Sequence, residues 1–157
     1  MAESLAVVVG FLLVSFVAGA IGSVFTRRAI PEWYVTLRKP TWTPPNWVFG
    51  PVWSTLYLMM GLAAWLVWRK VGWAGGTTAL ALFGAQLALN ALWSVLFFGM
   101  RSPGPAFVEM VVLWVMIVVT MVVFWAIRPV AGALLLPYLM WVTFAARLNW
   151  AVWRMNR

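Results

Sequence analysis

The sequence predicts an all-α integral membrane protein, a bundle of five transmembrane helices that forms a single domain over residues 1–157. Two observations predict this class. Hydrophobic residues make up 65% of the chain and charged residues only 9%, whereas soluble domains average roughly 45–50% apolar and about 25% charged residues. The apolar residues also fall in five long stretches with almost no charge, each near the roughly 20 residues that a helix needs to cross a bilayer. A soluble monomer is therefore excluded.

The five predicted helices cover residues 4–25, 46–68, 77–100, 106–127 and 130–153. The first is too long for the core of a signal peptide and lacks a convincing cleavage site, so we expect it to be retained as a span. The second follows Thr43-Pro44-Pro45, a favourable helix start because proline is tolerated in the first helical turn. Transmembrane barrel strands would instead be about ten residues long, with alternating apolar and polar residues.

The connection between the first two helices, residues 26–45, is long and unusually aromatic. It contains Trp33, Tyr34 and Trp42, whose side chains need apolar cover, together with four prolines that stiffen its path. A connection of this length in a compact domain is usually functional. We therefore expect residues 26–45 to form a lid over a site.

The third predicted helix, 77–100, has two contrasting faces. At about 100° per residue, Gln86, Asn90 and Trp93 lie on one side. Polar side chains are costly toward lipid, so we expect this side to face the bundle interior or a cavity. Ligand binding and simple interhelical hydrogen bonding both remain open.

The opposite side of that helix carries small residues, which let another helix approach closely. Packing within the same chain and a homodimer interface both remain open for this stripe. Its residues are Ala81, Gly84, Ala88 and Ala91.

Two prolines inside predicted spans, Pro51 and Pro137, each lie close to aromatic residues. A proline removes one helical hydrogen bond and bends the helix, which opens space between neighbours. An indole beside such a bend offers a flat face and one N–H donor. Two interpretations remain open: a clamp for a large planar ligand that includes Asn90, or aromatic side chains that merely shape the core. The aromatic residues concerned are Trp53, Tyr57, Tyr138 and Trp141.

Two charged residues fall within the last two spans. Glu109 lies in the first turns of 106–127, where we expect the helix dipole and Arg101 to stabilise its charge. Arg147 lies about two turns before the end of 130–153, and its long side chain can reach the headgroups.

The absence of two residue types excludes much chemistry. The chain has no Cys and no His, so thiol nucleophiles, imidazole relays and the usual zinc, iron–sulfur and haem ligands are excluded. The three acids, Glu3, Glu32 and Glu109, are far apart in sequence, and we predict no metal site. The basic residues form short clusters between apolar stretches rather than a nucleic-acid-binding stripe, so we predict no nucleic-acid partner.

The basic clusters predict the orientation in the membrane. The side with the first loop, the third loop and the C-terminus carries seven basic residues, and the other side carries Arg69, Lys70 and Arg128. The positive-inside rule places the C-terminus and the first loop in the cytoplasm. The seven residues are Arg27, Arg28, Arg38, Lys39, Arg101, Arg154 and Arg157.

Three segments resemble the translocator protein family, also called tryptophan-rich sensory protein, TspO/MBR or peripheral-type benzodiazepine receptor. They are WYVTLRKPTWTPPNWVFGPVWSTLY (33–57), GAQLALNALWSVLFFGMR (84–101) and LLPYLMWVTFAARLNWAVWRMN (135–156). The match covers nearly the whole chain in order. The resemblance implies a five-helix bundle, usually a homodimer, with a ligand pocket closed by the first loop.

The resemblance also implies ligands and site residues. Family members bind tetrapyrroles such as protoporphyrin IX, isoquinoline and benzodiazepine-type drugs and, in animals, cholesterol; some bacterial members are reported to degrade protoporphyrin in light. The two tryptophans tied to that reaction match Trp53 and Trp141. Sterol binding is doubtful here because Trp150 replaces the tyrosine of the cholesterol-recognition pattern. The remaining positions matched to the family's ligand site are Trp33, Trp42, Tyr57, Asn90, Trp93, Tyr138 and the small residue Ala145.

The leading functional hypothesis is a membrane receptor or sensor that binds tetrapyrroles in an interhelical pocket, with protoporphyrin IX as ligand and no covalently bound cofactor. Arg38 or Lys39 would then meet the ligand's propionates. A light-dependent porphyrin-degrading enzyme is the second hypothesis, because the pigment itself would carry the photochemistry. A transporter of tetrapyrroles or lipids is the third, although no inverted repeat is visible.

Overall fold

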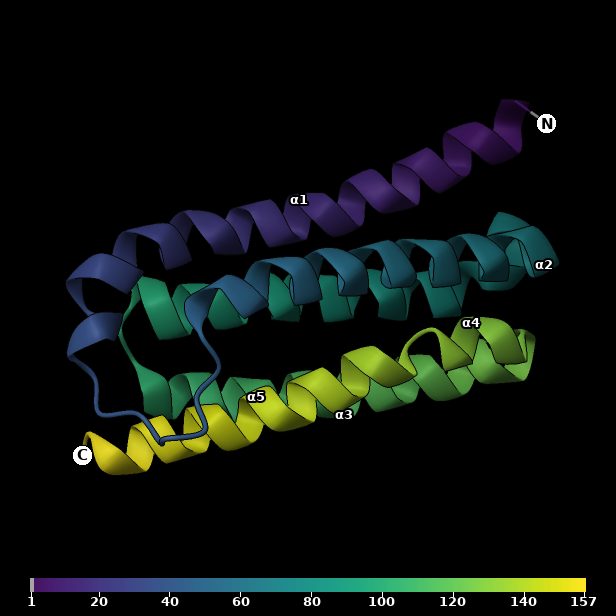
Figure 1. Cartoon of the computed structure of the whole chain (residues 1–157). Helices are drawn as coiled ribbons and strands as arrows, with labels where there is room; N and C mark the ends of the chain where they lie inside the picture. The colour runs from purple at the N-terminus through teal and green to yellow at the C-terminus, as the bar shows by residue number, and fades with distance from the viewer. Residues whose placement is uncertain (1) are drawn as a thin grey trace.

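The computed structural model describes residues 2–157, and its regular structure is entirely helical (Figure 1). Long helices lie roughly along one common direction, with the first loop and the C-terminus at the same end of the bundle. The elements are α1 (Ala2–Glu32), η1 (Tyr34–Thr36), α2 (Asn46–Ser94), η2 (Val95–Gly99), α3 (Pro103–Ile127), α4 (Pro129–Ala133) and α5 (Leu136–Met155).

The first helix is longer than predicted. α1 continues to Glu32 and includes Arg27 and Arg28, so the connection to α2 spans residues 33–45 rather than 26–45. A helix of 31 residues extends about 46 Å, longer than the roughly 30 Å hydrocarbon core. Its last two turns can therefore lie outside the bilayer, where arginine is a good helix former.

Four helical segments are long and apolar enough to cross a membrane, where the sequence predicted five separate helices. The difference lies in Asn46–Gly99, a segment of 54 residues that contains both 46–68 and 77–100. At Gly72 the backbone leaves the helical region (φ 68°, ψ −172°), a conformation that glycine adopts without a Cβ penalty. Figure 1 shows α2 turning back on itself at one end of the bundle. The fold-back brings the Tyr57 hydroxyl within 2.7 Å of Asn90 Oδ1.

The other end of α2 passes through a π-helical turn, η2, to a tight connection. Arg101 adopts the left-handed conformation (φ 53°) and its guanidinium pairs with Glu32 at 2.9 Å. Arg101 therefore does not neutralise Glu109, and that expectation was wrong. Glu109 is buried on α3, and neither of its carboxylate oxygens has a hydrogen-bond partner within residues 2–157.

The last predicted span, 130–153, is interrupted. α4 ends at Ala133 and α5 begins at Leu136, so Pro137 lies in the first turn of α5 rather than inside a continuous helix. A proline there costs no helical hydrogen bond. Pro51 lies inside α2, as predicted, as its sixth residue.

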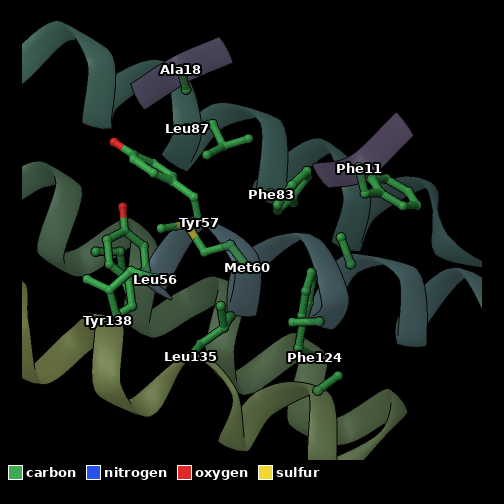
Figure 2. Close-up of a cluster of buried hydrophobic side chains, with 14 of the residues drawn as sticks. Phe11, Ala18, Leu56, Tyr57, Met60, Phe83, Leu87, Phe124, Leu135 and Tyr138 are labelled. Atoms are coloured by element: carbon green, nitrogen blue, oxygen red, sulfur yellow. The ribbon is translucent and has the colours of Figure 1, made fainter. Parts of the chain in front are cut away.

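The core lies between all the long helices and is almost entirely apolar (Figure 2). α1 packs on α2, and α3 packs on both α2 and α5. Gly61 permits the closest approach of α1, because a Cβ built there would lie 3.1 Å from Leu12 Cα. The side chains labelled in Figure 2 include Phe83, Phe124 and Leu135, each nearly inaccessible to solvent.

Candidate functional site

The centre of the bundle holds a chain of three polar side chains. The Tyr57 hydroxyl donates to Asn90 Oδ1 (2.7 Å), and Asn90 Nδ2 donates to the Tyr138 hydroxyl oxygen (3.1 Å). All three residues are buried, and Figure 2 shows the hydroxyl groups of Tyr57 and Tyr138 on the same side of the core cluster. These hydrogen bonds connect both halves of α2 to α5. It confirms that Asn90 faces the interior.

Two further side chains extend this polar centre. Trp53 stacks on Tyr57, with ring centroids 5.5 Å apart, and meets Tyr138 edge-on at 6.2 Å. Gln86 is 1% exposed; its Nε2 lies 3.7 Å from Met60 Sδ, and its Oε1 has no partner within residues 2–157. The prediction that Gln86 faces the interior is also confirmed.

A cavity of about 510 Å³ lies between the first half of α2 and α5. Its walls are almost wholly apolar, which suits a hydrophobic ligand. Of the predicted ligand-binding residues, Trp141 alone lines it, and the Trp141 indole N–H is buried with no partner in the described chain. The lining residues are Pro51, Val52, Thr55, Leu56, Met59, Pro137, Met140, Trp141 and Phe144.

An aromatic row connects this cavity to the first loop. Trp141 contacts Phe49 of α2 (5.7 Å between centroids) and Phe144 (5.4 Å). Phe144 meets Trp42 of the loop at 5.8 Å, and the Arg147 guanidinium lies 5.6 Å from the Trp42 ring. Trp42 is therefore held at the edge of the cavity, consistent with its predicted place in a lid.

Trp33 and Trp93 belong to a different cluster, closer to the end of the bundle. Trp93 stacks on Phe97 at 5.1 Å, and Trp33 meets the same ring at 5.6 Å. The Trp93 indole N–H donates to Asn149 Oδ1 (2.9 Å), and Asn149 in turn donates to the Pro103 carbonyl (2.8 Å). These contacts hold the base of the first loop, η2 and α5 together, so both tryptophans pack at the base of the first loop.

The loop is also fastened to the end of α5. Asn156 accepts a hydrogen bond from the Arg38 backbone N–H (2.9 Å) and donates to the Arg38 carbonyl (2.8 Å). Lys39 Nζ donates to the Tyr34 and Leu37 carbonyls and lies 4.7 Å from the Tyr34 ring centroid. Figure 1 shows the loop crossing α5 at this end. Lys39 is thus engaged within the loop, whereas the Arg38 side chain is exposed.

The remaining predicted residues lie apart from the cavity lining. Ala145 is half-buried and packs against the main core. Of the predicted dimer stripe, three residues are exposed and Ala91 is half-buried. A Cβ at Gly84 would meet no atom within 4 Å. Most of the stripe therefore faces outward. The exposed residues are Ala81, Gly84 and Ala88.

Several residues of this region were not singled out from the sequence. Phe49, Phe144 and Met140 are ordinary apolar residues of predicted spans, and only the crossing of α2 and α5 places them at the cavity. Asn149 and Asn156 carried a weak signal, since each is an amide near the end of an apolar helix. The partners that tie Asn149 to α3 and Asn156 to the first loop lie 46 or more residues away in sequence, which periodicity does not reveal.

The comparison with known proteins agrees with this architecture. Residues 11–154 match the TspO/MBR family. The chain belongs to the TspO/MBR family. It is 43% identical over 155 residues to "Tryptophan-rich protein TspO" of Chlorobaculum tepidum, covering 98% of this chain and 96% of that protein. It is 41% identical over 149 residues to the human "Translocator protein", covering 94% and 88% of the two chains.

The "Tryptophan-rich sensory protein" of Cereibacter sphaeroides is 41% identical over 148 residues, covering 92% of this chain and 91% of that protein. Membership of the TspO/MBR family together with several long apolar helices establishes an integral membrane protein. The resemblance inferred from the three sequence segments is thereby confirmed.

Proposed function

We propose that this TspO/MBR protein is a membrane receptor that binds tetrapyrroles such as protoporphyrin IX in the cavity between α2 and α5. The observation that carries the proposal is Trp141, which lines the apolar cavity and whose buried indole N–H has no partner within residues 2–157. A buried donor of this kind is costly unless a ligand or water accepts from it. A planar macrocycle with ring nitrogens and carboxylates supplies both acceptors and a large apolar surface.

The surroundings of the cavity support a large planar ligand rather than a small polar one. Phe144 and Trp141 present aromatic faces on α5, and Met59 and Met140 are flexible side chains that can adapt to a rigid ring. The exposed Arg38 on the loop is the proposed partner of a propionate. Trp42 and Phe144 would close over the ligand, and Asn90 would hold the pocket's inner wall through Tyr57 and Tyr138.

The test is a titration of protoporphyrin IX in the dark, with the full chain in lipid nanodiscs. We expect saturable binding that Trp141→Phe weakens about five-fold, the loss associated with one hydrogen bond of roughly 1 kcal/mol. Trp125→Phe is the control, since Trp125 lies on α3 near α4, away from the cavity. Absence of saturable binding, or equal weakening by the control, would contradict the proposal.

Illumination of the same samples separates the receptor from a porphyrin-degrading enzyme. Trp53 and Trp141 lie on either side of the α2–α5 crossing, and the rings of Trp53, Tyr57 and Tyr138 are in contact. A light-dependent product that disappears in Trp53→Phe and Trp141→Phe favours the enzyme. Flux of the ligand across sealed vesicles favours a transporter.

We also propose a homodimer and an orientation in the membrane. The outward-facing small residues around Gly84 support association of two copies through α2, because they let helices approach closely. One end of the bundle holds the first loop, the η2–α3 connection and the C-terminus, and it carries most of the basic residues. This distribution supports a cytoplasmic location for that end. Cross-linking at Gly84→Cys, and protease access in vesicles of known orientation, test these two points.

A further inference from the structure

A second cavity lies on the outer face of the bundle, between α3 and α5, and is separate from the α2–α5 cavity. Its volume is about 440 Å³, within the roughly 300–1,000 Å³ range of small-molecule sites. The α3 residues recur at i, i+4 and i+7 and the α5 residues at i, i+3, i+4 and i+7, so each set is one stripe of its helix. The lining residues are Phe107, Val111, Trp114, Thr143, Ala146, Arg147 and Trp150.

The groove has a hydrogen-bonded pair of side chains at one end and is basic at the other. The Trp114 indole N–H donates to Thr143 Oγ1 (2.8 Å), and Thr143 donates to the Leu139 carbonyl (2.7 Å), so these polar groups satisfy one another. Toward the C-terminus of α5, the wall includes Arg147 and Trp150, and the Arg154 guanidinium lies 5.7 Å from the Trp150 ring. An elongated apolar chain fits such a groove, with its charged end at the arginines.

The arginines at this end lack anionic partners in the chain. Within residues 2–157 the one ion pair joins Arg101 to Glu32, and Glu109 is buried in the core. Arg147 instead lies over Trp42, and Arg154 over Trp150. Arginines on aromatic faces keep their N–H donors available for a phosphate, which they bind through two parallel hydrogen bonds. The charge of this surface is therefore complementary to an anionic ligand that approaches along the membrane.

We propose that the α3–α5 groove binds one anionic phospholipid, with an acyl chain along Val111 and Trp114 and its phosphate on Arg147. Anionic headgroups are attracted to basic residues at a membrane surface, and the bilayer supplies the acyl chain at the depth of the groove. Because Arg147 also contacts Trp42, the bound phosphate lies next to the residue that holds the first loop. The groove shares no lining residue with the α2–α5 cavity, but the two sites meet at Trp42, which contacts both Arg147 and Phe144.

The test is native mass spectrometry of the full chain in a neutral detergent, titrated with dioleoylphosphatidylglycerol or dioleoylphosphatidylcholine. We expect one phosphatidylglycerol retained in preference to phosphatidylcholine. Arg147→Gln should weaken its retention about five-fold, the effect of one basic side chain at an anionic surface. Arg28→Gln is the matched control: Arg28 is exposed at the same end of the bundle, on α1, outside the groove.

A second variant separates the groove from general attraction of anionic lipid. Val111 is 46% exposed and lines the groove, so Val111→Trp fills it without disturbing the core or any charge. We expect it to reduce retention of phosphatidylglycerol while leaving thermal unfolding unchanged. Equal retention of the two lipids, equal weakening by Arg28→Gln, or full retention by Val111→Trp would each overturn the proposal.

Discussion

Two regions of the bundle, the Asn90 centre and the α2–α5 cavity, differ in how far their buried hydrogen-bonding groups are satisfied. Around Asn90, both the amide oxygen and the amide nitrogen bond to tyrosines, and the region is closed by Trp53. At the α2–α5 crossing, Trp141 lines an apolar cavity, and its buried indole N–H has no partner within residues 2–157. A satisfied buried network stabilises one arrangement of helices, whereas an unsatisfied buried donor is free to bind something else. The first region is therefore structural, and the second is where we place the ligand.

The largest expected effect comes from breaking the satisfied region. Asn90→Ala leaves the Tyr57 and Tyr138 hydroxyls buried without their shared partner, so we expect a loss of about 2 kcal/mol in stability. The measurement is the thermal unfolding midpoint of the purified protein in detergent. Gln86→Met is the control, because Gln86 makes only a 3.7 Å contact with sulfur and its Oε1 is unpartnered. If Asn90→Ala is no less stable than Gln86→Met, the hydrogen bonds from Asn90 to Tyr57 and Tyr138 contribute little to stability.

The second prediction breaks the unsatisfied region. Trp141→Phe removes an indole N–H donor that has no partner within residues 2–157. The free energy of unfolding of this variant should therefore stay within about 0.5 kcal/mol of the wild-type value. The same variant should lose about five-fold in protoporphyrin IX affinity. A large loss of stability with unchanged affinity would reverse the roles assigned to the two regions. Differential scanning fluorimetry and the dark titration together decide between them.

The third prediction concerns the loop over the cavity. Asn156→Ala removes both hydrogen bonds that hold the Arg38 backbone to the end of α5, so we expect trypsin to cleave after Arg38 several-fold faster. The change is measured from the cleavage rate of folded protein. Asn46→Ala is the control, since Asn46 is also exposed, at the start of α2. Equal cleavage rates in the two variants would show that Asn156 does not hold the loop.

The smallest effect concerns pH at the loop base, outside the spans. Burial raises the pKa of the Tyr34 phenol above its ordinary 10.0. The neutral form is thus favoured in the folded protein, and this contribution to stability is present below pH 10 and is lost as pH rises through the raised pKa. Above pH 10, the stability of Tyr34→Phe should therefore fall less steeply with pH than that of the wild type. The two slopes should differ by less than about 1.4 kcal/mol per pH unit. Identical slopes would contradict the assignment.

Much of this architecture follows from the composition and the hydrophobic periodicity of the sequence. The features that were not predicted correctly have physical causes. The inward positions of Gln86 and Asn90 follow from the cost of polar groups in lipid, which acts on one helix at a time. Residues 46–68 and 77–100 were predicted as separate helices, whereas the structure joins them in one helical segment that reverses direction at Gly72 with no loop between the two halves. The length of α1 was underestimated because charge ends a membrane span but does not end a helix.

The site was less accessible from the sequence than the fold. Trp53, Tyr57, Asn90 and Tyr138 were expected together and do lie together, because each faces the interior of its own helix. The cavity lies instead where α2 and α5 cross, and its walls come mostly from apolar residues that no pattern distinguishes. Arg101 was paired with Glu109 on sequence proximity, whereas the fold brings it to Glu32, 69 residues away.

The measurement that tests the central claim most directly is the indole N–H spectrum of the full chain, labelled with ¹⁵N-tryptophan, during a dark titration with protoporphyrin IX. Trp141→Phe identifies the Trp141 signal by its absence, and Trp93, whose N–H is already bonded to Asn149, is the internal reference. We predict that the Trp141 signal moves downfield as its N–H acquires an acceptor, while the Trp93 signal stays in place. Saturable binding with an unmoved Trp141 signal would contradict the claim that the ligand lies against Trp141 in the α2–α5 cavity.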